Sequence, residues 1–381
     1  MLVSLLQSFK IYGRLNAINI ALLTELQTRS HSRLEELKVE SRPVITLRRT
    51  SSIPTALLTF FLVLFAILAC RSTNQTKDPG WTKLKVLSDK EDHPSKIVVD
   101  GEAVYFITGG TVASMNEGTN NIKKILLKDG TVSVLVKGGK IIPDEMLAVD
   151  DKFLYWSDGG NIMRVPKGGG ESEKIIPGAP KPDEIVMDEE NFYWLVWGGE
   201  GSPPSPLMFA PKAGGEPKEL TPRYSGTSGI SIDRDNVYWM TGEGIKKISK
   251  KGGEVVDVYR NTSKSPSLGL LQDADNFYFA QMNNRGHSAL MKLSKKGGEA
   301  TQLTASINHV MDFIADSENI YYFDNVPGKG SFGPLALMKV SKTGGNPIEL
   351  DQGEGGWIKY LAVDAKQVYF TDIARVNAIA K

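Results

Sequence analysis

One short phrase recurs seven times in the chain: an Asp, three further residues, then an apolar residue followed by two aromatic residues. The Asp residues that open the seven copies are Asp100, Asp150, Asp188, Asp233, Asp273, Asp316 and Asp364. Neighbouring copies are about 40–50 residues apart, which is the period of propeller repeats built from short strands. The repeat therefore predicts a β-propeller.

Each copy has the composition of four strands. An almost wholly apolar segment such as 147–149 precedes the Asp, and the aromatic segment follows it. A third segment such as 162–165 ends at a Lys-x-Gly-Gly hairpin, and a short polar segment such as 216–220 completes the copy. The prediction is an all-β, seven-bladed propeller of four-stranded antiparallel blades. The first strand of each blade is expected to be buried on both faces.

The two ends of the repeat region predict how the ring closes. The seventh copy has a third segment at 376–379 but no fourth, while residues 82–87 precede the first copy and read as an outermost strand. We expect residues 82–87 to pair with the last blade, because closure hides sheet edges.

The repeated turns favour structural roles. Asp side chains accept backbone N–H bonds in turns, whereas a calcium loop would also need a distal bidentate Glu. The Gly pairs of the Lys-x-Gly-Gly segments suit tight β-hairpins. A glycine-rich phosphate-binding loop would instead be followed by a helix. The aromatic stripe is expected in the core, with a sugar-binding stripe as the alternative. The acids and lysines of these turns are expected to share one face and pair, for about 0–1 kcal/mol each.

The amino-terminal part reads as an export segment. Arg48 and Arg49 precede an apolar run within 51–70, which is short for a spanning helix. Its end, Ile67-Leu68-Ala69-Cys70, resembles a bacterial lipobox, which implies cleavage and lipidation at Cys70, the one cysteine of the chain. The alternative is an uncleaved membrane anchor at residues 53–69.

The expected organisation has four parts. Residues 1–50 form an extension. It is either an artefact of a translation start assigned too early or a cytoplasmic tail. Residues 51–70 are the signal peptide with its lipobox or the anchor, 71–80 a linker, and 81–381 the propeller. Arg71 in place of Asp implies an outer-membrane lipoprotein, facing the periplasm or the surface.

The segment Leu154-Tyr155-Trp156-Ser157-Asp158 resembles the YWTD-type propeller repeat. With the Lys-x-Gly-Gly hairpins, the copies resemble still more the Tyr-Trp repeats of bacterial secreted propellers of unknown function. The resemblance covers about 300 residues and implies the fold. YWTD propellers usually have six blades and linked cysteine-rich modules, so their receptor function is not implied.

Composition argues against several classes of chemistry. A net charge of +1 gives no general attraction to nucleic acid. The four histidines are scattered, and no nucleophile elbow or dinucleotide motif occurs. We therefore expect no metal, no cofactor and a monomeric propeller.

Function is expected on the face opposite the regular turns, where irregular loops lie. The candidate ligand-binding residues are Asp144, Glu145, Asp183, Glu184, Trp197, Arg223, Tyr224, Asn283, Arg285, His287, His309, Asp312 and Trp357. The expected function is an exported, membrane-tethered binding or scaffold propeller that recognises a protein or glycan of the cell envelope. The alternatives are a secreted lyase or hydrolase at the central channel mouth and a structural assembly subunit.

Overall fold

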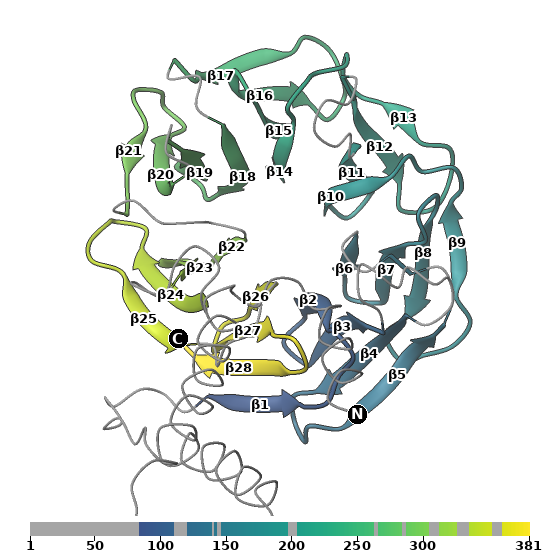
Figure 1. The fold of residues 1–381 in the computed structure, drawn as a ribbon. Helices are drawn as coiled ribbons and strands as arrows, with labels where there is room; N and C mark the ends of the chain where they lie inside the picture. The colour runs from purple at the N-terminus through teal and green to yellow at the C-terminus, as the bar shows by residue number, and fades with distance from the viewer. Residues whose placement is uncertain are drawn as a thin grey trace, which may run out of the picture. The chain divides into compact units, whose positions relative to one another are not determined.

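The computed structural model describes residues 84–109, 120–138, 141–142, 146–196, 204–262, 266–283, 287–304, 312–325, 335–352 and 360–381. They form seven antiparallel four-stranded sheets, arranged as blades around a central axis (Figure 1). The predicted extension, signal segment and linker, with Cys70, lie outside the described residues. No helix with the length and apolarity needed to cross a bilayer occurs among the described residues.

The four strands of each blade follow one another from the axis outward. The first strands are β2 (Ser95–Val99), β6 (Leu147–Val149), β10 (Pro182–Met187), β14 (Ser228–Ile232), β18 (Ser267–Gln272), β22 (Phe313–Ala315) and β26 (Leu361–Val363). The second strands are β3 (Ala103–Thr108), β7 (Phe153–Ser157), β11 (Asn191–Val196), β15 (Asn236–Thr241), β19 (Asn276–Met282), β23 (Asn319–Asn325) and β27 (Gln367–Thr371). We number the blades 1 to 7 in this order.

The outer half of each blade completes the sheet. The third strands are β4 (Asn121–Leu126), β8 (Ile162–Pro166), β12 (Leu207–Pro211), β16 (Gly244–Ser249), β20 (Ser288–Ser294), β24 (Leu335–Ser341) and β28 (Val376–Ala380). The outermost strands of blades 1 to 6 are β5 (Val132–Lys137), β9 (Glu173–Ile176), β13 (Lys218–Glu219), β17 (Val256–Arg260), β21 (Thr301–Gln302) and β25 (Ile348–Gln352).

The seventh blade takes its outermost strand from the other end of the propeller. Strand β1 (Lys85–Ser88) pairs antiparallel with β28, with Lys85 opposite Ala378 and Val86 opposite Asn377. The predicted closure by the amino-terminal strand is thus confirmed over its described part.

The core lies between the blades. Seven clusters of buried residues each join two neighbouring blades, the last joining blade 7 to blade 1. Aromatic side chains of the second strands fill them, and the rings of Tyr155 and Phe192 meet edge to face at 5.0 Å across blades 2 and 3. These rings are buried, so the sugar-binding alternative for the stripe is wrong.

Burial of the first strands differs from the prediction. All six residues of the second strand β3 are buried, whereas β2 keeps three of its five residues partly exposed. The first strands have open space on their inner side at the axis, whereas the second strands have a strand on either side and a blade above and below.

The repeated Asp closes its own turn and also binds the next blade. In blade 2, Asp150 Oδ1 accepts the backbone N–H groups of Lys152 and Phe153. Its Oδ2 accepts the Tyr155 hydroxyl at 2.7 Å and Lys212 Nζ of blade 3 at 2.6 Å. The same inter-blade ion pair joins Asp100 to Lys167, Asp188 to Lys250, Asp273 to Lys342 and Asp316 to Lys381.

These pairs are more buried than expected. The side chains of Lys212 and Asp150 are only 14% and 23% exposed. Burial by itself raises the pKa of the Asp150 carboxyl, but hydrogen bonds from Lys212 and from the backbone outweigh it and lower this pKa from 3.8 to about 2. The pKa values of Asp273 and Asp316 are also lowered to about 2 against the effect of burial.

We expect the propeller to lose stability between about pH 4 and pH 2. A carboxyl whose pKa is lower in the folded state stabilises that state above its unfolded pKa, and the contribution disappears as pH falls through the folded pKa. For the three carboxyls at about 2, the loss is about 1–2 kcal/mol each. Urea unfolding at a series of pH values measures it, and a free energy of unfolding that stays flat from pH 4 to pH 2 contradicts the assignment.

Candidate functional site

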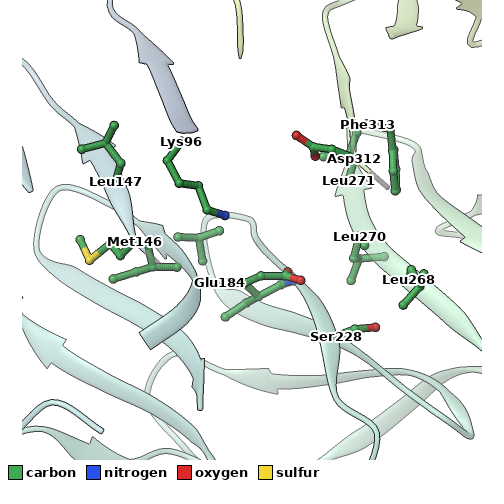
Figure 2. Close-up of a pocket in the computed structure, with 14 residues that line it drawn as sticks. Lys96, Met146, Leu147, Glu184, Ser228, Leu268, Leu270, Leu271, Asp312 and Phe313 are labelled. Carbon is green, nitrogen blue, oxygen red and sulfur yellow. The ribbon is translucent and has the colours of Figure 1, made fainter. Parts of the chain in front are cut away.

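A cavity of about 370 Å³ lies at the axis, surrounded by the first strands of six blades (Figure 2). Most of its lining residues, including all three charged ones, sit in the first half of these strands or just before them. In antiparallel blades this is the end reached by the loops between blades and by those between second and third strands. The cavity is therefore at the loop-rich end of the axis, away from the Asp and Lys-x-Gly-Gly turns.

One register position supplies the charged side chains of this cavity. It is the fourth residue before each turn Asp, which we call the ring position. Its seven occupants are Lys96, Met146, Glu184, Gly229, Gly269, Asp312 and Tyr360. The next position is apolar in every blade, and its occupants are Ile97, Leu147, Ile185, Ile230, Leu270, Phe313 and Leu361. Apolar residues hold the strand in the core, so the ring position is free to vary.

Strand pairing explains why the ring position faces the axis. In blades 1, 3, 4 and 5 the register between first and second strands shifts across this position. A bulge of this kind leaves a residue unpaired and redirects its side chain. In blades 2, 6 and 7 the ring position immediately precedes the strand. Figure 2 shows Lys96, Glu184 and Asp312 extending toward the cavity from three different blades.

The two carboxylates make equivalent contacts three blades apart. Glu184 Oε2 of blade 3 accepts the backbone N–H of Ile230 in blade 4 at 3.2 Å. Asp312 Oδ2 of blade 6 accepts the N–H of Leu361 in blade 7, also at 3.2 Å. Bulged or terminal strand positions leave such N–H groups without a ladder partner, and the carboxylates satisfy them.

The cation of the cavity is held by an aromatic ring. Lys96 Nζ lies 5.0 Å from the centroid of the Tyr360 ring, a cation–π contact between blades 1 and 7. Among the described residues no ion pair joins Lys96 to a carboxylate. Burial raises the pKa of the Asp312 carboxyl, although the positive charge of Lys96 and the Leu361 N–H act in the opposite direction.

Two of the ring positions are occupied by glycine. Gly229 and Gly269 have φ values of +57° and +62°, and a Cβ on Gly229 would lie 2.3 Å from the carbonyl carbon of Gly269. Blades 4 and 5 thus approach each other backbone to backbone at the ring position, as only glycine permits.

The structure separates the predicted site residues into three groups. Glu184 and Asp312 line the cavity, and Asp183 precedes Glu184 in β10. Arg223, Tyr224, Asn283 and His287 do not line it. Six predicted residues lie outside the described residues: Asp144, Glu145, Trp197, Arg285, His309 and Trp357.

The four residues away from the cavity have local structural contacts. Arg223 is exposed and pairs with Glu219. Tyr224 bridges the backbone of Ser205, and its ring packs on Trp239 at 5.8 Å.

Asn283 and His287 close the loop between β19 and β20 by backbone and side-chain hydrogen bonds. A pairing of His287 or His309 with a carboxylate of the cavity would favour the enzyme alternative; within the described ranges His287 makes no such pair, and His309 lies outside them.

Sequence reasoning missed Lys96, Ser228 and the apolar lining because it searched loops, whereas these residues belong to strands. Alignment of the copies on the turn Asp contains the missing signal, since the ring position varies among Lys, Met, Glu, Gly, Asp and Tyr next to a position that is apolar in every blade. Within the described parts of the chain, no three His, Cys, Asp or Glu side chains are grouped to hold a metal ion.

No protein-family model matches the chain, and no curated protein matches its sequence. Among solved structures, a puromycin-hydrolysing peptidase of Mycobacterium tuberculosis superposes with a TM-score of 0.57 at 11% identity, over 79% of this chain and 54% of that one. The computationally designed Ika8 protein superposes with a TM-score of 0.53 at 11% identity, over 79% of this chain and 100% of that one. An acylaminoacyl peptidase of Pyrococcus horikoshii superposes with a TM-score of 0.54 at 14% identity, over 76% of this chain and 52% of that one.

The chain spans about half the length of the two peptidases. At identities this low the likeness concerns the fold alone, so peptidase activity belongs to those proteins, and the YWTD-type repeat stays a prediction. What this chain shares with the solved structures is the propeller fold.

Proposed function

We propose that this chain is an exported, membrane-tethered binding protein that takes a protein ligand of the cell envelope at its loop-rich face. The axial cavity is the centre of the contact. The supporting observation is that charged side chains from three blades gather around one cavity at this face. On the turn face, the repeated Asp and Lys side chains are mostly used in inter-blade ion pairs. At the cavity, charged groups from blades 1, 3 and 6 face a common space.

The lining favours a protein over a glycan. The second-strand aromatic residues, such as Trp194 and Trp239, are buried between blades and present no stacking surface. Among the described lining residues Phe313 is the one aromatic side chain, whereas three are charged. Charged groups in an apolar setting select partners of complementary charge.

Capture from envelope extract tests the proposal. The full-length chain in mild detergent is cross-linked to extract, and Lys96→Met removes the charge while keeping most of the side-chain length. Asp129→Asn is the control, because Asp129 lies exposed in a turn on the opposite face. We expect Lys96→Met to lower capture of a protein partner about fivefold or more, with Asp129→Asn equal to wild type. Equal capture by Lys96→Met, or capture of a polysaccharide instead, contradicts the proposal.

The tether has a separate test. Cells grown with a radioactive fatty acid are expected to label the wild-type chain at Cys70, because two or more acyl chains anchor a protein stably. Cys70→Ser should abolish the label. An unlabelled wild type, or label that persists in the variant, rules out lipidation at this residue.

A further inference from the structure

Exposed apolar side chains gather at one part of the outer edge of the propeller. Eight large apolar side chains of the described residues are exposed, and five of them lie on or beside the outermost strands of three neighbouring blades. They are Leu84 and Val86 of blade 7, Val132 and Val134 of blade 1, and Ile348 of blade 6, with exposed fractions of 38–57%. Figure 1 shows β25, β1 and β5 in that order along this edge. We call these five residues the apolar rim.

Strand pairing places the apolar rim on both sides of β1. Val86 lies opposite Asn377 in β28, and Ile379, two residues further on, packs against blade 6. Side chains two residues apart share a face of the sheet, so Val86 faces the boundary between blades 6 and 7. Val132 lies opposite Ile125, which packs against blade 7. Val132 therefore faces the boundary between blades 7 and 1.

The two strands at the centre of the rim contain lysine and no acidic residue. Strand β1 includes Lys85 and strand β5 includes Lys137, and both lysines are exposed. By contrast, the outermost strands β9, β13, β17 and β25 each contain at least one Asp or Glu. Exposed aliphatic side chains beside lysines suit the boundary between the acyl chains and the anionic headgroups of a bilayer.

The linker connects this edge of the propeller to the proposed tether. Leu84 follows Cys70 by only 14 residues, which span at most about 50 Å when fully extended. A lipid at Cys70 and an anchor over residues 53–69 would both place the bilayer next to residue 70. A tether raises the effective concentration of the membrane at β1, so that even a small contact area is sufficient for binding.

We infer that the apolar rim rests on the surface of the membrane to which the chain is tethered. Its five apolar side chains enter the headgroup–acyl boundary, and Lys85 and Lys137 extend their ammonium groups to the lipid phosphates. The axis of the propeller then runs along the plane of the membrane, and the loop-rich face is open to a partner from the side. This inference rests on the membrane tether of the proposed function.

A second copy of the chain fits the rim less well. Strand β1 is only four residues long, and its pairing register shifts between Val86 and Ser88. Short and irregular edge strands protect a sheet from pairing with the edge of another sheet. The protein ligand of the proposed function takes the loop-rich face, which leaves the rim available to the bilayer.

Tryptophan quenching in vesicles tests the inference. The full-length protein is reconstituted in vesicles of phosphatidylethanolamine and phosphatidylglycerol, with or without bromine atoms on the acyl chains, because bromine quenches nearby tryptophan. Val86→Trp and Val134→Trp place a reporter on the rim. Val256→Trp is the matched control, since Val256 lies on the outermost strand of blade 4 and is 44% exposed, as is Val86. The emission of the wild-type chain in the same vesicles is subtracted.

Brominated lipid is expected to remove most of the emission added at positions 86 and 134 and to leave the emission added at position 256 unchanged. Equal quenching at all three positions, or no quenching at the two rim positions, overturns the inference. A shift of the rim emission to shorter wavelength that grows with protein density, without quenching by brominated lipid, assigns the rim to a second copy and also overturns it. Two rim positions are used so that the result does not depend on the folding of one variant.

The tether, the ligand and the rim fail separately. Protein that floats with the vesicles but shows no quenching at the rim keeps its tether and removes this inference. Protein that does not float with the vesicles, and takes up no fatty acid, removes the tether and this inference together. Failure to capture an envelope protein removes the proposed ligand and leaves quenching at the rim as support for the membrane contact.

Discussion

Replacing Gly229 by Ala is expected to lower the free energy of unfolding by about 2–5 kcal/mol. The Cβ would lie 2.3 Å from the carbonyl carbon of Gly269 and 2.4 Å from the backbone nitrogen of Leu270. These are backbone atoms of the neighbouring first strand and have no rotamer with which to move away. The left-handed φ of +57° adds about 1–2 kcal/mol for any residue with a Cβ, and overpacking adds about 1–3 kcal/mol.

Gly252→Ala is the matched control. Gly252 also has a positive φ, +83°, but an added Cβ would meet nothing within 4 Å. The expected cost is about 1 kcal/mol, from backbone conformation alone. Urea unfolding of both variants measures the difference, and equal losses would show that blades 4 and 5 do not touch at their backbones.

Asp150→Ala is the second large effect, with an expected loss of about 3 kcal/mol. The variant removes the acceptor for two turn N–H groups, for the Tyr155 hydroxyl and for Lys212 Nζ. Hydrogen bonds to a charged group contribute about 1.5–3 kcal/mol, and removing one partner of a largely buried pair leaves the other charge without compensation. The lysine side chain is only 14% exposed, so water replaces the lost carboxylate poorly.

Two comparisons isolate the contact between blades. Asp129→Ala removes an exposed turn Asp that accepts the backbone N–H of Thr131, so its effect on the free energy of unfolding should be much smaller. Asp150→Ala combined with Lys212→Met should recover part of the loss, because the uncompensated ammonium group is gone. If the double variant is no more stable than Asp150→Ala, the ion pair between blades 2 and 3 is not what stabilises this contact.

The blade repeat was predictable because each copy solves the same packing problem. The aromatic pair after the Asp must fill a gap between neighbouring blades, and the Asp must close a tight turn, so both recur at one register. The pairing of β1 with β28 followed from counting strands at the two ends. The degree of burial was not predictable in the same way: apolar first strands such as 147–149 suggested burial on both faces, but the axis leaves their inner side open.

The candidate site was predictable only in part. Glu184 and Asp312 were found because they border irregular loops. Lys96, Gly229 and Tyr360 were missed, since each looks in isolation like an ordinary residue at the start of a strand. Their common register becomes meaningful only when the copies are superposed.

By itself the amino-acid sequence determined the number of blades, the strands of each and the closure of the ring, because these depend on local periodicity repeated seven times. The cavity depended on tertiary structure alone. Radial packing brings one residue from each of seven distant segments to the axis, and strand bulges redirect the side chains of Lys96 and Glu184 inward. Neither the meeting of Lys96, Glu184 and Asp312 nor the backbone contact at Gly229 exists until the blades pack side by side around the axis.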